Sequence, residues 1–239
     1  MKNQAHASPE AKRVFVRRMF DGIAGTYDLL NHLLSAGVDI VWRRRTIDGL
    51  GIQPGWLILD LATGTGDLAF EAFARHPSAR IVGADLSIPM MSIGKKKEAR
   101  GKGVVRFVCG DAERLPFGSQ TFDAISIGFG VRNFSRLDVG LKEMYRVLRP
   151  GGKLAVLEFS KPKAVLMRSL YLFYFRNVLP LIGRIVSRDP QAYRYLYESV
   201  MLFPEGEEFQ RRMETSGFKN SNVSRLSLGI ANIYLAERA

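Results

Sequence analysis

Residues 56–67 carry the clearest hydrophobic pattern in the chain. They begin with a short apolar run without polar alternation, which is typical of a strand buried in a parallel sheet. Two glycines follow, Gly64 and Gly66, and residues 68–75 then show helical spacing without a helix breaker. Glycine lets the backbone turn sharply and approach a ligand closely. The order strand, glycine turn, helix therefore predicts the start of a nucleotide-binding α/β unit.

The same alternation continues along the chain. Apolar runs predict further strands, and segments with helical spacing separate them. The last two strands are predicted to pair and to complete the sheet. We therefore expect an α/β fold with a mostly parallel sheet of seven strands. The further strands are expected at residues 80–85, 104–109, 122–127, 153–159, 218–226 and 230–236, and helices at 89–100, 137–148 and 205–216.

The first 50 residues are predicted to be mainly helical. Ser8 and Pro9 form a typical helix start, with serine as the cap and proline in the first turn. Residues 25–28 interrupt the helical spacing, and a third helix is predicted at residues 39–50, with Arg43 and the two arginines after it on its surface. This helical prelude either packs over the ligand as a lid or forms a plain structural cap on the sheet.

Length and composition indicate a single domain. A chain of 239 residues, of which 46% are apolar, can build one large core. No uncharged apolar run reaches the roughly 18 residues of a membrane-spanning helix, and the N-terminus lacks an apolar signal core. We expect four parts: a helical prelude (1–50), a cofactor-binding core (51–160), a helical insertion (161–204), and a terminal helix with a strand pair (205–239).

Cysteine content and charge indicate the cellular compartment and the kind of partner of the protein. The single cysteine, Cys109, excludes an internal disulfide framework and fits a reducing cytoplasm. Its place at a strand end favours a small buried filler over a catalytic thiol. No metal site is expected, because acids and histidines do not cluster. The net charge of +12 points to an anionic partner, either nucleic acid or acidic lipid, although plain solubility explains it too.

The residue before the glycine turn separates two classes of ligand. Residues 64–69 fit the dinucleotide pattern G-x-G-x-x-A, which favours a nicotinamide-dependent oxidoreductase. However, Asp60 ends the preceding strand, and a carboxylate there would repel a pyrophosphate. It suits a ligand with a cationic amino group, such as the methionine moiety of S-adenosylmethionine. The alternative is that Asp60 only caps the turn.

Acids follow the next two predicted strands as well. Asp85 lies 19 residues beyond Gly66, where an acid can accept both ribose hydroxyls. Asp111 follows the third strand and can accept from an adenine amino group, with residues 115–117 as an apolar wall nearby. Because the carboxyl ends of parallel strands share one edge of a sheet, three acids in these positions indicate a nucleotide site more strongly than the glycine turn does.

Several stretches of the sequence resemble a known family. The segments around Asp60, Asp85 and Asp123 look like a class I S-adenosylmethionine methyltransferase, which implies a Rossmann-like fold. Narrower motifs resemble the quinone-biosynthesis C-methyltransferases, which methylate demethylmenaquinol or 2-methoxy-6-polyprenyl-1,4-benzoquinol. The resemblance covers about residues 13–237. The narrower motifs are Tyr27-Asp28 with Asn31, residues 128–133, residues 157–162, and residues 193–196 with Glu198 and Ser199.

The resemblance implies a set of cofactor contacts. The family's S-adenosyl-L-methionine contacts fall on Thr65, Asp85 and the pair Asp111-Ala112, and we add Asp60 and the glycines of the turn. Many members have a serine at the end of the fourth strand, where this chain has Gly128, so that contact must come from the backbone. The position of Asp111 is asparagine in some relatives. The expected cofactor-binding residues are Asp60, Gly64, Thr65, Gly66, Asp85, Asp111, Ala112 and Gly128.

The nature of the methyl acceptor limits what catalysis requires. No Asn/Asp-Pro-Pro-aromatic box follows the fourth strand, which disfavours methylation of a planar amine. A reduced quinone ring is electron-rich, so the protein must mainly align the reactants and assist loss of a hydroxyl proton. Arg132 is the first candidate to stabilise a phenolate or to orient a water, and its alternative role is to tie the loop. Tyr27 and His32 are weaker candidates.

Residues 161–194 suggest how a prenylated quinol is reached. Seven basic residues and one acid give this segment a net charge of +6, and bulky apolar residues lie between them. That pattern is typical of an interfacial helix on an anionic membrane, and a core helix with a solvated face is the alternative. We therefore expect a cytoplasmic, peripheral enzyme, with other quinone-biosynthesis enzymes as possible partners and no nucleic acid. Oligomeric state and prenyl length stay open.

Two further functions fit the same sequence. The basic charge fits an RNA methyltransferase, which would bind nucleic acid in a salt-sensitive way. A catalytically silent methyltransferase fold could also act as a scaffold for other quinone enzymes. The intact motifs favour an enzyme over the scaffold.

Overall fold

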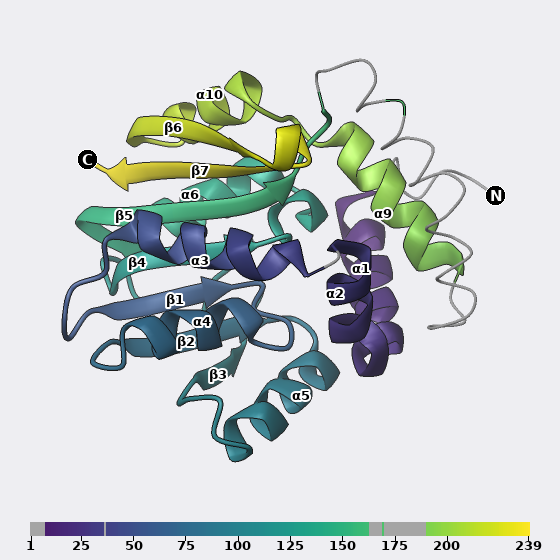
Figure 1. Cartoon of the computed structure of the whole chain (residues 1–239). Coiled ribbons are helices and arrows are strands. Elements are labelled where there is room, and N and C mark those ends of the chain that lie inside the picture. Colours follow the sequence, from purple (N-terminus) through teal and green to yellow (C-terminus); the bar gives the residue numbers. More distant parts are fainter. Residues whose placement is uncertain (1–7, 36, 163–168, 170–189) are drawn as a thin grey trace.

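Seven strands form one mixed sheet in the computed structural model, which describes residues 8–35, 37–162, 169 and 190–239 (Figure 1). The strand order is β3-β2-β1-β4-β5-β7-β6. The first five strands are parallel, and β7 runs antiparallel to both β5 and β6. The predicted α/β fold is thereby confirmed. The strands are β1 Leu57–Leu61, β2 Arg80–Asp85, β3 Arg106–Cys109, β4 Phe122–Gly128, β5 Leu148–Phe159, β6 Phe218–Leu226 and β7 Ala231–Arg238.

Helices cover both faces of the sheet, and neighbouring residues of β1 show why. Ile58 belongs to a core cluster with Leu50 and Leu68, whereas Leu59 belongs to the cluster on the opposite face with Leu141. Such continuous burial explains why the strand lacks polar alternation. The helical elements are α1 Pro9–Ile23, η2 Ala24–Thr26, α2 Tyr27–Ser35, α3 Val38–Leu50, α4 Asp67–Arg75, α5 Ile88–Ala99, η3 Val131–Asn133, α6 Leu137–Val147, α9 Pro190–Leu202, α10 Glu207–Thr215 and η5 Ser227–Gly229.

The helical prelude divides into two parts with different positions. Helices α1 and α2 lie beyond the carboxyl ends of the parallel strands, with α9 beside them, whereas α3 packs against one face of the sheet (Figure 1). Ser8 caps α1 as predicted, since its Oγ accepts from the backbone N–H of Ala11 at 3.3 Å. Because ligands of parallel α/β sheets bind at the carboxyl ends, α1 and α2 are positioned to cover a bound ligand.

Two expectations about single residues are wrong. Arg43 is not on the surface of its helix: only 8% of it is exposed, because Asp39 and Asp67 both pair with its guanidinium. Cys109 is exposed rather than buried. It ends β3, which is short and lies at the edge of the sheet, so one side of the strand has no neighbouring strand to cover the thiol.

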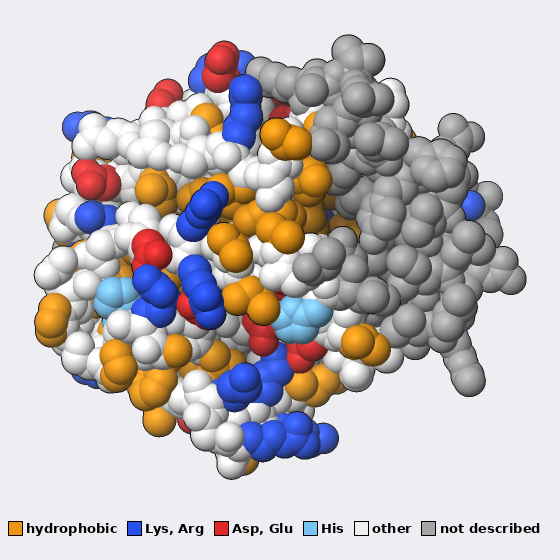
Figure 2. All heavy atoms as spheres, in the orientation of Figure 1, with side chains coloured by type: hydrophobic (Ala, Val, Ile, Leu, Met, Phe, Trp, Pro, Cys, Tyr) orange, Lys and Arg blue, Asp and Glu red, His pale blue; other side chains and the backbone are white. Residues whose placement is uncertain are grey.

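The basic segment after β5 is only partly described. Most of the predicted interfacial segment, at residues 163–168 and 170–189, lies outside the described residues. None of the described helices is both long and apolar enough to cross a membrane. On the face drawn in Figure 2, Lys and Arg side chains stand in separate groups with acidic and uncharged surface between them. The described residues of that face form no continuous basic stripe.

Candidate active site

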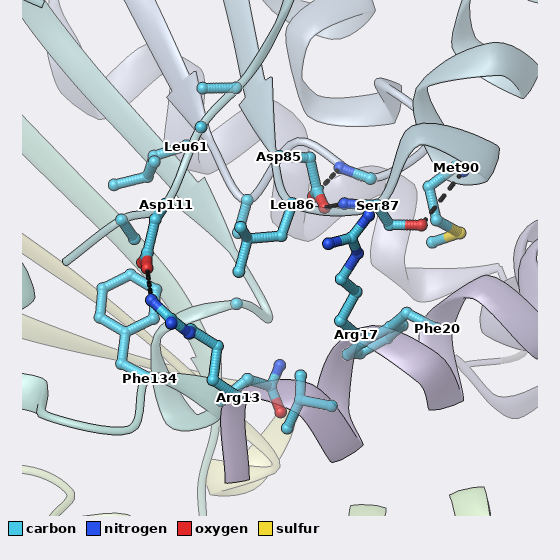
Figure 3. A pocket seen from close by; sticks show the side chains of 18 of the residues that line it. Arg13, Arg17, Phe20, Leu61, Asp85, Leu86, Ser87, Met90, Asp111 and Phe134 are labelled. Atoms are coloured by element: carbon cyan, nitrogen blue, oxygen red, sulfur yellow. Dashed lines mark hydrogen bonds and ion pairs between the residues drawn. The ribbon is translucent and has the colours of Figure 1, made fainter. Parts of the chain in front are cut away.

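A pocket opens where β1, β2 and β4 end, beneath α1. It brings together five of the residues predicted to bind the cofactor, namely Gly64, Asp85, Asp111, Ala112 and Gly128. A smaller cavity adjoins it and is lined by Asp60 and Thr65, and both cavities share Gly64, Gly128 and Tyr27. Seven of the eight residues predicted to bind the cofactor thus line two adjoining cavities, whereas Gly66 lines neither, and their contacts with a cofactor stay a prediction. Figure 3 shows how the acids and α1 face each other across the pocket.

The glycine turn has a backbone shape that only glycine adopts without strain. Gly64 and Gly66 both have positive φ, at 55° and 86°. A Cβ on Gly66 would lie 2.9 Å from the ring of Phe70. The turn therefore needs glycine for conformation at both positions and for packing at the second.

Asp85 holds the glycine turn against the end of β2. Its Oδ2 accepts from the backbone N–H of Gly64 at 2.7 Å, and its Oδ1 accepts from that of Ser87 at 2.8 Å (Figure 3). Burial raises the pKa of this carboxyl. A carboxylate has about four lone-pair positions, so Asp85 still has capacity for two ribose hydroxyls.

Asp60 caps the glycine turn and also lines the smaller cavity. Its carboxylate accepts from Thr63 Oγ1 at 2.6 Å, which caps the turn, and from Ser126 Oγ at 2.8 Å. The residue is 1% exposed, and burial raises its pKa to about 6. Asp60 also lines the smaller cavity, where a cationic amino group would offset the cost of its buried charge. The contacts show that it caps the turn and leave it available to a ligand.

Arg13 of α1 reaches the acid predicted to face adenine. Arg13 Nη1 lies 2.6 Å from Asp111 Oδ2, and Asp111 Oδ1 accepts from the backbone N–H of Glu113 at 2.8 Å. Figure 3 shows the arginine crossing the mouth of the pocket. Arg13 was not among the predicted site residues, because nothing in a helical repeat shows which of its basic residues faces a distant strand end.

A charged network fastens α2 to the glycine turn. Asp28 accepts from Thr65 Oγ1 at 2.5 Å and pairs with Lys97 Nζ at 2.7 Å. The same Nζ lies 2.5 Å from Asp67 and 3.0 Å from Thr65 Oγ1. This network fixes the start of α2, and with it Tyr27, at the wall of both cavities. Burial raises the pKa of Tyr27, so its phenol is a donor rather than a base at neutral pH.

His32 takes no part in the lining of either cavity. Its Nδ1 lies 3.1 Å from Asp39 Oδ2, and its side chain is 44% exposed. Asp39 is almost fully buried and also accepts from Ser35 Oγ at 2.6 Å. The histidine therefore neighbours the charged network rather than the pocket, and its catalytic role stays a prediction without support from this geometry.

Arg132 is held inside the protein by its own loop. Its guanidinium donates to the carbonyl of Phe129, lies 2.7 Å from Glu158 Oε1 and packs 5.4 Å from the ring centre of Phe159. Only 7% of the side chain is exposed, and it does not line the main pocket. These contacts are those of a residue that shapes the loop. The direct catalytic role stays a prediction.

Asn133 offers the pocket an acceptor that the sequence analysis did not identify. It lines the main pocket, and its buried Oδ1 has no partner among the described residues. A buried acceptor without a donor is costly, so the site favours a ligand group that donates a hydrogen bond. The residues of both cavities thus fit S-adenosylmethionine. Acids are available for its amino group, ribose and adenine, and glycines stand where the protein backbone must come close to it.

Comparisons with known proteins agree with this site. The ubiE/COQ5 methyltransferase family model matches residues 6–238. A "Demethylmenaquinone methyltransferase" of Thermus thermophilus is 48% identical over 92% of this chain and 100% of its own length. A "Ubiquinone/menaquinone biosynthesis C-methyltransferase UbiE" of Geotalea daltonii is 46% identical over 93% and 96%.

Solved structures of low sequence identity share the fold. A SAM-dependent methyltransferase of Thermotoga maritima, described as a possible histamine N-methyltransferase, matches 93% of this chain and 99% of its own. Its TM-score is 0.67 at 18% identity. The fold, the pocket and the extent of the sequence match lead to one conclusion. This chain belongs to the ubiE/COQ5 methyltransferase family.

Proposed function

We propose that this enzyme transfers a methyl group from S-adenosyl-L-methionine to a ring carbon of a prenylated quinol, with demethylmenaquinol as the first substrate to test. The observation that carries the proposal is the match to relatives named for this chemistry over more than 90% of both chains. The second candidate ring is 2-methoxy-6-polyprenyl-1,4-benzoquinol, because one of these relatives is named for both pathways. Both substrates require the same bond from an electron-rich ring carbon to the methyl group.

Different residues of the site would bind the cofactor and enclose the reacting ring. S-adenosylmethionine supplies an activated methyl group when it is bound. Asp60, Asp85 and Asp111 are available to its polar groups, and Tyr27 and Phe129 form part of the wall around it. Enclosure by α1 and α2 would exclude water and orient the ring, which is the main requirement for attack by an electron-rich carbon.

Loss of the quinol hydroxyl proton has no obvious base among these residues. Arg132 stays charged and is tied to Glu158, and the raised pKa of Tyr27 keeps its phenol protonated. We infer that the protein assists ionisation electrostatically, or through water, rather than by direct proton abstraction. Arg132 would act through the loop that it shapes, which carries Phe129 and Asn133 into the pocket.

We further propose that the basic segment after β5 brings the enzyme to an anionic membrane. The segment begins two residues after Phe159, whose ring stacks on that of Phe129 at 4.4 Å, and Phe129 lines the pocket. A substrate tail that leaves the pocket past Phe129 would thus meet the start of the segment. This arrangement supports delivery of a prenylated quinol from lipid.

Turnover with defined acceptors tests the proposed function. The purified enzyme would be incubated with isotope-labelled S-adenosylmethionine and chemically reduced short-chain demethylmenaquinol, the matching benzoquinol, or total RNA. Mass spectrometry of the products should show one added methyl on a quinol ring. Labelled RNA without labelled quinol would instead establish the RNA methyltransferase, and an absence of any labelled product with bound cofactor would favour the silent scaffold.

A further inference from the structure

A second, larger cavity lies behind the η3 loop, apart from the cofactor pocket, and Arg132 of that loop lines it. It has a volume of about 500 Å³. The start of α6, helices α9 and α10 and the amino-terminal part of α1 line it. Of the described residues, it shares Phe134 and Ser135 with the cofactor pocket. Those two residues lie near Asp111, at the predicted adenine end, so the cavity is poorly placed to present a ring to the methyl group.

The lining of this cavity carries a net positive charge. It contains Lys12, Arg132, Arg136 and Arg212, and the single acid in its described lining is Asp138. Arg212 pairs with Asp138 at 3.1 Å and with Glu208 at 3.6 Å, all on exposed side chains. Two more acids are buried outside the lining: Glu158 pairs with Arg132 and Glu113 pairs with Arg136, so these two cations of the lining are already compensated.

Lys12 is the least compensated of these cations. Its Nζ donates to the carbonyls of Phe134 at 2.7 Å and of Arg132 at 3.3 Å. No carboxylate of the described residues lies within ion-pair distance of it. Burial lowers the pKa of Lys12, and the charge of Glu113, which lies beyond ion-pair distance, offsets that effect only in part. An anion in direct contact would therefore stabilise the ammonium group.

Buried donors without partners lie in the same lining. Among the described residues, Tyr195 Oη, Arg132 Nε and Arg212 Nε are buried polar atoms that make no hydrogen bond, although 40% of the Arg212 side chain as a whole is exposed. Tyr195 is only 4% exposed. An unmet buried donor costs about 1–3 kcal/mol, and such groups in native proteins usually have a ligand or a bound water. Three of them around one cationic cavity indicate an oxygen-rich, negatively charged ligand.

We propose that this cavity binds a phosphate group. Its oxygens would accept from Lys12, Tyr195 and Arg212, which come from three different helices. Lys12 is followed on α1 by Arg13, the residue that crosses the cofactor pocket, and its carbonyl partners flank Asn133 of that pocket. A bound phosphate would therefore fix α1 and the η3 loop together, and the cavity would couple an anion to the closure of the cofactor site.

Two sources of a phosphate fit the cavity. Leu202, Phe203 and Pro204 form an apolar part of the lining, and Leu202 is 55% exposed. The phosphate is thus either a free ion or the headgroup of a phospholipid whose chain follows these residues. The site itself does not depend on which acceptor is methylated.

Calorimetric titration of the full-length protein with inorganic phosphate tests the site, with chloride at equal ionic strength as the reference. We expect saturable phosphate binding that Arg212→Gln weakens about tenfold or more, since charge-assisted hydrogen bonds contribute about 1.5–3 kcal/mol each. Arg211→Gln is the matched control, because Arg211 is the exposed neighbour on α10 and its loss changes the net charge equally. Equal weakening by both variants, or binding that chloride abolishes, overturns the proposal.

Tyr195→Phe provides a test that does not depend on charge. It removes an unpartnered hydroxyl, so the thermal midpoint without phosphate should be unchanged or higher, while phosphate affinity falls several-fold. A lower midpoint together with unchanged phosphate affinity would show that the hydroxyl serves the fold alone. Dihexanoyl phosphatidylglycerol then distinguishes the sources: affinity tenfold above that of inorganic phosphate assigns a lipid headgroup, and equal affinity assigns the free ion.

Discussion

Ionisation of the Asp60 carboxyl group in the folded protein is unfavourable, because the group is buried. Burial raises its pKa from an ordinary value of 3.8 to about 6, and the two hydroxyls that donate to it offset only part of that cost. The folded protein therefore holds this proton more tightly than the unfolded chain does. Its contribution favours folding below pH 4, and the stability is lost as the pH rises to about 6.

Asp60→Asn should remove this pH dependence. Relative to the parent, the variant should gain free energy of unfolding between pH 4 and 6.5, by about 3 kcal/mol for a shift of two units. Urea unfolding at several pH values measures the difference. The same variant should bind S-adenosylmethionine more weakly at pH 7.5, because the cationic amino group loses its charged acceptor. A flat difference in unfolding free energy across this range would contradict the shifted pKa.

Arg132 and Glu158 can be separated by a double variant. Arg132→Ala alone should destabilise the fold by about 3–5 kcal/mol, because it leaves a fully buried carboxylate without its partner. Adding Glu158→Gln should recover much of that loss in thermal unfolding.

Activity of the same double variant decides the role of Arg132. If Arg132 acts by shaping the loop, kcat should recover together with stability. If it assists the proton directly, kcat should stay low with cofactor affinity intact and should rise at alkaline pH, where the quinol hydroxyl ionises unaided.

At the scale of elements, Lys97 is the residue that connects α5, α2 and the glycine turn. Lys97→Met should loosen the start of α2, because Asp28 and Asp67 then lose the cation between them. We expect about tenfold weaker cofactor binding and faster hydrogen exchange in α2. Lys96→Met is the control, since Lys96 is the exposed neighbour on the same helix. Equal effects of the two variants would show that Lys97 does not hold α2 against the glycine turn.

Sequence patterns predict elements whose signal is local. The strand at residues 57–61 and the cap at Ser8 were predictable, because burial on both faces and a capping hydroxyl leave traces in adjacent residues. The start of β5 was predicted five residues too late, since Pro150-Gly151-Gly152 is typical of a turn. Leu148 pairs with Phe122 and Lys153 pairs with Ala124, so residues 149–152 form an irregular stretch between two paired positions of one strand.

Contacts between segments that are distant in the sequence account for the remaining differences between the predictions and the structure. The three acids of the site were predictable because parallel strands bring their carboxyl ends to one edge. Arg43 appeared to belong to a solvated basic run, and only the fold brings Asp67 to it. Arg13 and Lys97 meet their partners 98 and 69 positions away, which no short-range pattern records.

At the scale of the whole molecule, the net charge is +12, and matched variants can show which of the basic residues bind an anionic membrane. Changing Arg168, Arg176 and Arg184 to glutamine should strongly reduce sedimentation with anionic vesicles, because each basic residue near such a surface contributes about 1 kcal/mol. The same change of charge at Lys95, Lys96 and Arg100, which are exposed in or next to α5, should have a smaller effect.

Activity on two different quinol substrates distinguishes a loss of membrane binding from a loss of folding in these variants. Activity on a water-soluble short-chain quinol should survive in the first variant, while activity on a long-chain quinol in vesicles should fall. Equal loss of both activities would mean that residues 161–194 serve the fold, and equal sedimentation of both variants would mean that the charge acts without a specific surface.

The strand order has a consequence for the protein while it is being translated. β7 follows every other strand in sequence, yet it lies between β5 and β6. Its Tyr234 is fully buried, and the phenol accepts from the backbone N–H of Gly206 at 2.7 Å. While a ribosome is still making residues 231–238, β5 has an open edge, and open edges invite pairing with other chains. The nascent protein is thus prone to aggregation until residues 231–238 have been made and have paired with β5, and strands β1 to β5 must wait in that condition for β7.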